Sequence, residues 1–428
     1  MAANRFVSLP YLLLRSATAG GGLLAGLIQT FVFARVLDPE RFSVYILIGT
    51  LGVTLWLADL GIAKILFVRL RAWFLGEQDR DAEITHYTTA VVILYFLLNL
   101  VCAALCFVFA RFWFGTTVQS GVEMALFFLF TALTLIWFVL RNVSVAVDQF
   151  LYFETMEAAR RIGHIAVMLA TLAGLPFLVF LLLANLIWAV LFALLLKRLA
   201  QTGAVTLRIA GWWRSLKAFL HNNIKEVVHS GTYSANEFFL YSFPYAVVPW
   251  AFGLGAPTII LDTAFKVFRG ATVLYCAGCD VAVPRQTRAY GEGDRRSLIL
   301  STLIAAAVGT LPCIVLIAML ALFSDWAFSF LLGNAATVPM AVSWMLIVLL
   351  IASLAQTVSN YLLVHTGYFR WISRLSLIVS LTMTVATLIA VAAKVDLIGF
   401  FQVYTAVYVA SALAYLSLAL RGPLRKPA

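Results

Sequence analysis

Long apolar stretches alternate with short polar, mostly basic segments along this chain. A helix that crosses a bilayer needs about 20 mostly apolar residues. The pattern therefore predicts twelve membrane-spanning helices, at residues 10–36, 42–68, 87–110, 121–147, 159–175, 177–197, 226–252, 256–284, 298–323, 337–364, 371–393 and 398–420.

The fifth and sixth stretches are separated only by a tight turn at Gly174 and Pro176. If they formed one long helix, there would be eleven spans and every later loop would change side. With the N-terminus in the cytoplasm and twelve spans, 21 of the 30 lysines and arginines fall in cytoplasmic segments. Cytoplasmic loops are typically enriched in these residues. The charge pattern thus favours twelve spans with both termini cytoplasmic.

Composition excludes an ordinary soluble domain, because 63% of the residues are hydrophobic and 11% are charged, against about 25% charged residues in soluble chains. The net charge of +11 does not indicate a nucleic-acid partner, since the basic residues lie between apolar segments. Arg15 interrupts the first apolar run, so we interpret this segment as a retained helix and not a signal peptide. The five cysteines lie in apolar segments and predict no disulfide framework.

An internal repeat relates the two halves of the chain. A shift of 217 residues aligns Gly61 with Gly278 and Arg71-Ala72-Trp73 with Arg288-Ala289-Tyr290. Six helices per copy is an even number, so both copies share one orientation in the membrane. We therefore expect an all-α integral membrane protein of two six-helix lobes, related by a pseudo-two-fold axis along the membrane normal, with the functional site between them.

This division assigns residues 1–200 to an N-terminal lobe, 201–225 to a basic amphipathic linker, and 226–428 to a C-terminal lobe. The linker carries Trp212 and Trp213 among several cations. It is either an interfacial helix on anionic lipid or a charged linker that reflects the positive-inside rule.

Five cations fall inside predicted spans, where charges are costly and commonly mark a pathway or a site. Asp262, Lys266 and Arg269 lie on one helical face, at spacings of four and three. One interpretation is an Asp262–Lys266 pair that only holds helices together, and end-placed cations can also extend to the headgroups. Taken together, the five predict a cationic substrate-binding cavity that opens inward: Arg15, Lys64, Arg141, Lys266 and Arg269.

A cationic cavity suits an anion. Arginine binds phosphate through two parallel hydrogen bonds and lysine acts as a point charge, so a lipid-linked diphosphate is the expected ligand. Membrane lipid would hold the tail of this ligand while its headgroup enters the cavity.

Three acids are candidates for ion coupling. Glu237 lies midway along the seventh span and either pairs with Lys266 or Arg269 or exchanges H⁺ or Na⁺; Asp262 and Asp59 are the other two. Glu123 and His164 lie near span ends, where we expect an interfacial position. We find no Walker, nucleophile-elbow or metal-ligand motif, so no catalytic residue, metal site or cofactor is predicted.

Three motifs carry a family resemblance: Phe33-Ala-Arg-Val-Leu-Asp-Pro-Glu-Arg-Phe-Ser-Val-Tyr45, Ala58-Asp-Leu-Gly61, and the paired Arg-Ala-aromatic loops. On these residues the chain resembles the Wzx-type O-antigen and polysaccharide flippases of the multidrug/oligosaccharidyl-lipid/polysaccharide (MOP) exporter superfamily. It departs from that family at Ser43, where the family often has glycine.

The resemblance implies a transporter and not an enzyme, in the bacterial cytoplasmic (inner) membrane. Its cargo would be a lipid-diphosphate-linked oligosaccharide, moved to the outer leaflet by alternating access with H⁺ or Na⁺ coupling. Contact with the polysaccharide polymerase machinery is also implied.

Three other functions compete. A multidrug antiporter of the same fold would more often carry an acid in the first helix. A lipid II flippase usually has two more helices, and a membrane polysaccharide polymerase would show a large outer loop. For a flippase, we expect Lys266→Ala and Arg269→Ala to abolish glycan export while protein levels stay intact.

Overall fold

The computed structural model describes residues 9–76, 83–112, 115–206 and 209–425, apart from the side chains of residues 9–16, 19, 56, 229–237, 277, 281, 284 and 312. Within these ranges every regular element is a helix. Contacts divide the chain into two compact units, residues 1–43 with 239–428 (unit 1) and residues 44–238 (unit 2). The chain passes from one unit to the other inside α2 (Pro39–Thr54) and inside α10 (Ile224–Tyr241).

Unit 1 holds the first helix and the last six: α1 (Leu9–Val36), α11 (Phe243–Phe252), α12 (Ala256–Gly291), α13 (Arg295–Leu332), α14 (Met340–His365), α15 (Phe369–Ala392) and α16 (Leu397–Arg421). Unit 2 holds η1 (Leu55–Asp59), α3 (Ile62–Leu75), α4 (Glu83–Phe112), α5 (Val118–Ala132), α6 (Thr134–Ala146), α7 (Phe150–Ala170), η2 (Thr171–Ala173), α8 (Phe177–Gln201) and α9 (Trp212–Asn222). The contacts thus group α1 with the C-terminal helices, whereas the lobes at 1–200 and 226–428, which rest on the internal repeat, stay a prediction.

All twelve predicted spans are helical in the described chain. Eight of the described segments are long and apolar enough to cross a membrane by length and composition. The turn at Gly174, with a φ of 97°, separates α7 from α8. The interpretation that joined the fifth and sixth stretches into one helix is therefore wrong.

The second predicted span is not one continuous helix. It divides into α2, the 3₁₀ turn η1 and α3, because Leu60 and Gly61 both adopt left-handed backbone angles, with φ of 47° and 80°. Two successive residues of this kind interrupt the hydrogen-bond ladder, and glycine adopts such angles without strain. The Ala58-Asp-Leu-Gly61 motif therefore encodes a helix break.

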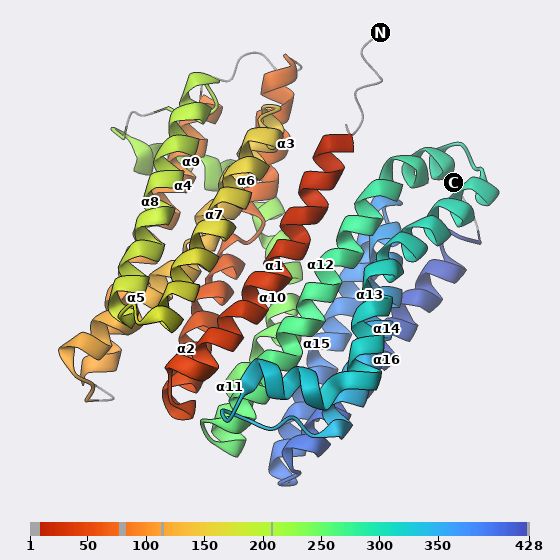
Figure 1. The fold of residues 1–428 in the computed structure, drawn as a ribbon. Helices are drawn as coiled ribbons and strands as arrows, with labels where there is room; N and C mark the ends of the chain where they lie inside the picture. Colours follow the sequence, from red (N-terminus) through yellow and green to blue (C-terminus); the bar gives the residue numbers. More distant parts are fainter. Residues whose placement is uncertain (1–8, 77–82, 113–114, 207–208, 426–428) are drawn as a thin grey trace. The chain divides into compact units, whose positions relative to one another are not determined.

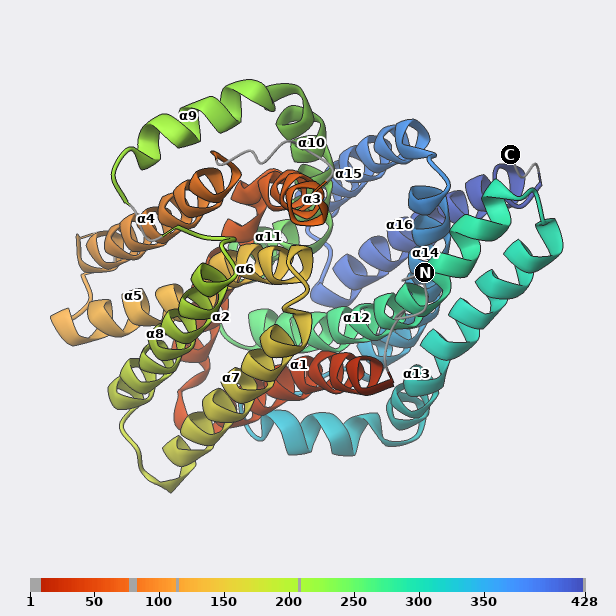
Figure 2. The same cartoon turned by 90° about the horizontal axis from the view of Figure 1, so that it is seen from above.

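Within unit 1, α12 packs along α1, α13 and α14 (Figures 1 and 2). Its crossing with α13 is close at Gly278, where an added Cβ would lie 2.8 Å from the backbone nitrogen of Gly309. Small residues let two helices approach in this way.

We expect Gly278→Ala to lower the unfolding free energy by about 1–3 kcal/mol, because the methyl group forces the two backbones apart. Gly291→Ala is the matched control in the same helix, since nothing lies within 4 Å of its added Cβ. Thermal unfolding midpoints of the two purified variants measure the difference. Equal midpoints would contradict close packing at this crossing.

Candidate functional site

The charged face of α12 forms a hydrogen-bonded set inside unit 1. Lys266 Nζ lies 2.6 Å from Asp262 Oδ2, and the hydroxyl of Tyr245 donates to Asp262 Oδ1 at 3.1 Å. Lys266 also donates to Thr30 Oγ1 on α1 at 3.0 Å. Asp262 is buried and Lys266 keeps 21% of its side chain exposed. The Asp262–Lys266 pair that the sequence left open is therefore formed.

Arg269 stabilises a break in the seventh predicted span. The seventh span divides at Ser242 into α10 and α11, and Pro244 has no N–H to donate to the carbonyl of Leu240 four residues earlier. Tyr404 Oη donates to that carbonyl at 3.0 Å, and Arg269 Nη2 donates to the carbonyl of Tyr241. Two side chains from α12 and α16 thus replace hydrogen bonds that the break removes.

Aromatic rings enclose the guanidinium of Arg269. The ring centroids of Tyr241, Tyr245 and Phe265 lie 5.5, 5.4 and 5.9 Å from its Cζ, within the distance at which a cation is attracted to a π face. Its Nε is buried and has no hydrogen-bond partner in the described structure. Arg269 therefore has the local partners that the sequence did not reveal, and it keeps one unused donor.

The charges of the described side chains at this α12 site do not cancel. Asp262, Lys266 and Arg269 together carry one negative and two positive charges, beside the hydroxyl groups of Tyr245 and Tyr404. A partly buried charge without a counter-charge is costly, so these side chains favour an additional anionic or acceptor group.

We expect Tyr404→Phe to lower the unfolding free energy by about 1–3 kcal/mol, because the Leu240 carbonyl would then be buried without a partner. Thermal unfolding of the purified variant in detergent measures this. Tyr152→Phe is the control, since the Tyr152 ring keeps its contact with Arg198 after the change. A midpoint equal to that of the control would show that the Leu240 carbonyl is satisfied in another way.

The other predicted substrate-binding cations are in different places. Lys64, exposed on α3, and Arg141, half-buried on α6, belong to unit 2, whereas Lys266 and Arg269 belong to unit 1. The side chains of Arg15 and of the proposed coupling acid Glu237 lie outside the described residues. A single cavity lined by all five cations stays a prediction.

Asp59 stabilises the break in the second span. Its Oδ1 accepts hydrogen bonds from Tyr95 Oη at 2.9 Å and from the backbone N–H of Ala63 at 3.0 Å. The carboxylate thus satisfies one of the unpaired N–H groups at the start of α3. Its role in ion coupling stays a prediction beside this structural one.

The sequence analysis did not predict a cluster of charged side chains on α7. The Glu157 carboxylate accepts hydrogen bonds from Arg160 Nε and Nη2 at 2.8 and 2.7 Å, from Arg161 Nε at 2.5 Å and from Trp137 Nε1 at 2.7 Å. Arg160 also stacks on Trp188, 4.4 Å from its ring centroid. Both arginines lie within α7, and their shared partner Glu157 lies three and four residues earlier in the same helix.

Glu123 and His164, for which we expect interfacial positions, are both buried between helices. Glu123 is 2% exposed and accepts hydrogen bonds from Tyr45 and Gln119. His164 is 4% exposed and its Nε2 lies 3.2 Å from the carbonyl oxygen of Ala184. Burial of both groups reflects helix packing that span-end position alone does not reveal.

No protein-family model and no curated protein matches this chain. Solved structures of transporters do match it over almost its whole length. A multidrug resistance MATE transporter of the MOP superfamily in its outward-facing conformation is 13% identical, with a TM-score of 0.63, and the match covers 97% of this chain and 96% of the other. The eukaryotic MATE transporter AtDTX14 is 13% identical with a TM-score of 0.65, and 97% of each chain is covered.

A MOP superfamily transporter from Pyrococcus furiosus, described as having a binding pocket of reverse polarity that suggests a different function, is 14% identical. Its TM-score is 0.63, over 97% of this chain and 96% of that one. These matches establish the fold. The chain has the all-α membrane fold of MATE transporters, with twelve spanning helices in two lobes, which confirms the predicted fold class.

Proposed function

We propose that this protein is a transporter that flips a lipid-diphosphate-linked oligosaccharide across the bacterial cytoplasmic membrane by alternating access. Both termini would lie in the cytoplasm, and a polysaccharide polymerase would be its partner. The observation that supports the proposal is the charge excess among the described side chains of the α12 site, where one acid is paired with one of two cations. The unused Nε–H of Arg269 can also donate a hydrogen bond to a phosphate oxygen.

The Asp262–Lys266 pair suggests how ion coupling would work. A diphosphate that binds Lys266 competes with Asp262, which would lose the cation 2.6 Å away. A buried carboxylate without a counter-charge strongly favours protonation or a bound cation. Asp262 would then take up H⁺ or Na⁺ when the cargo binds, and release it when Lys266 returns. Asp59 and Glu237 remain candidates for a second coupling position.

A multidrug antiporter is the second candidate. A cluster of aromatic rings beside the α12 site favours it. The centroids of Phe265 and Tyr404 lie 5.1 Å apart with tilted planes, and those of Phe268 and Tyr408 lie 5.1 Å apart edge to face. These rings are buried, so a flat apolar compound would pack against them only after the site opens. A cationic drug, however, would meet a net positive charge there, and for this reason we favour the anionic cargo.

Reconstituted protein separates the two candidates. In proteoliposomes, a lipid-diphosphate oligosaccharide placed in one leaflet should reach the other, and ethidium should not be expelled along an ion gradient. Glycan export in cells that lack their own flippase gives an independent readout. Ethidium efflux without glycolipid translocation would overturn the proposal and support the antiporter.

A further inference from the structure

Exposed cations and exposed apolar side chains lie close together in the sequence on α9 and its flanks in unit 2. We define the α9 strip as Ile209, Trp213, Arg214, Lys217 and Ile224. Arg214 and Lys217 are exposed, and Lys217 Nζ lies 5.4 Å from the ring centroid of Trp213. No Asp or Glu occurs from residue 158 to residue 225, so α9 itself carries no acid, and the next one is the exposed Glu226 in the first turn of α10.

The opposite face of α9 is already occupied. Leu216 and Phe219 are buried, and the Phe219 ring lies 5.6 Å from that of Tyr87 on α4. Just before α9, the N–H and carbonyl of Thr206 both bond to the Thr89 hydroxyl, at 3.0 and 2.8 Å. The helix is therefore fixed against α4, and the α9 strip faces outward.

The exposed apolar residues of the α9 strip indicate that it contacts a membrane surface and not water. Ile209, Trp213 and Ile224 are 64%, 52% and 53% exposed. A linker in water gains nothing by exposing them, whereas the boundary between headgroups and acyl chains accommodates apolar side chains and cations together. Tryptophan in particular is enriched at that boundary.

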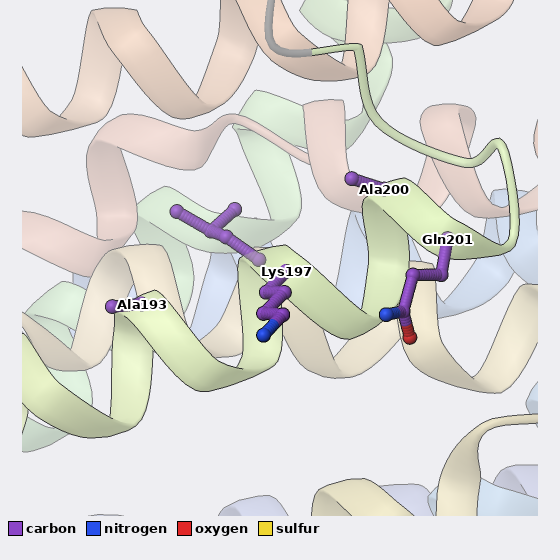
Figure 3. Close-up of a pocket in the computed structure, with 5 residues that line it drawn as sticks. Ala193, Lys197, Ala200 and Gln201 are labelled. Carbon is purple, nitrogen blue, oxygen red and sulfur yellow. The ribbon is translucent and has the colours of Figure 1, made fainter.

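A hollow on the preceding helix has the same chemistry. It has a volume of about 550 Å³ and is lined by residues of α8: Ala193, Leu196, Lys197, Ala200 and Gln201. Figure 3 shows Lys197 and Gln201 extending from this helix beside the small side chains of Ala193 and Ala200. An apolar hollow beside an amine can accept an acyl chain whose phosphate is held by the lysine.

We propose that α9 is an interfacial helix that binds anionic phospholipids. Arg214 and Lys217 contact headgroup phosphates, Trp213 and Ile209 lie at the acyl boundary, and the α8 hollow holds lipid chains. Each cation close to an anionic surface contributes about fivefold to lipid preference. Of the two interpretations of the linker, the interfacial helix explains why the cations of the linker lie beside exposed apolar residues.

Fluorescence quenching in vesicles tests this proposal on the full-length protein. The signal of Trp213 is obtained as the difference between wild type and Trp213→Phe, each reconstituted into phosphatidylcholine vesicles. Brominated phosphatidylglycerol or brominated phosphatidylcholine is then added at equal small mole fractions. We expect the Trp213 signal to be quenched several-fold more by the brominated phosphatidylglycerol.

The double variant Arg214→Gln/Lys217→Gln should abolish this preference. The charge-matched control Arg111→Gln/Lys394→Gln, which changes two cations at the predicted outer ends of helices, should keep it. Equal quenching by the two lipids, a preference that survives in the first double variant, or no quenching by either lipid would overturn the proposal. The readout reports lipid contact alone, so its outcome is independent of the transported cargo.

Discussion

Lys266→Gln should reduce glycolipid translocation at least about tenfold, because it removes the cation that we place on the diphosphate. A hydrogen bond to a charged group contributes about 1.5–3 kcal/mol, and about 1.4 kcal/mol corresponds to a factor of ten. The single variant also leaves Asp262 buried without its partner, so it should unfold at a lower temperature as well. Translocation rates in proteoliposomes and thermal unfolding in detergent measure the two effects.

The double variant Asp262→Asn/Lys266→Gln separates binding from structure. Replacing both charges of a buried pair is often close to neutral for stability, whereas removing one of them is destabilising. We therefore expect the double variant to recover wild-type stability within about 1 kcal/mol and to remain inactive. Recovery of translocation together with stability would show that the pair only joins helices, and would remove Lys266 from the proposed binding site.

Arg269→Ala should lower the unfolding free energy by about 2–4 kcal/mol. It removes a charged hydrogen bond to the Tyr241 carbonyl and the contacts with three rings, and both losses are destabilising. This refines the expectation from sequence, in which protein levels stayed intact. Chemical or thermal unfolding of the purified variant measures the loss, and translocation should fall with it.

Arg374→Ala is the matched control, because Arg374 is exposed on α15 and lies over a single ring, that of Trp371, at 5.8 Å. Surface changes of this kind usually alter stability by less than about 0.5 kcal/mol. Arg269→Lys keeps the charge but not the planar fork, so it should recover only part of the stability. Equal stability of Arg269→Ala and Arg374→Ala would contradict the capping role of Arg269.

The sequence predicted features that depend on local patterns. The number of spans followed from apolar length, because the bilayer sets the length of a span. The turn at Gly174 separates α7 from α8, as the charge pattern favoured. The Asp262–Lys266 pair followed from its spacing of four residues. In each case the information lies within one turn or one span.

Features that depend on distant segments could not be predicted. The partner of the Leu240 carbonyl is Tyr404, which is 164 residues away in the sequence, and no local pattern connects them. Pro244 lies in the seventh span, but its position does not indicate which side chains stabilise the break beside it. The Ala58-Asp-Leu-Gly61 break was also missed, because its apolar length alone fits one continuous helix.

The break between α10 and α11 has a consequence for inhibition. The side chains that donate to the carbonyls of Tyr241 and Leu240 belong to α12 and α16. The seventh span can therefore straighten only if both hydrogen bonds break. A small molecule that wedges between Tyr241 and Tyr404 and offers its own donors to those carbonyls would hold the bent form. Such a compound would arrest the protein in one state, and it would release Arg269 from the Tyr241 carbonyl.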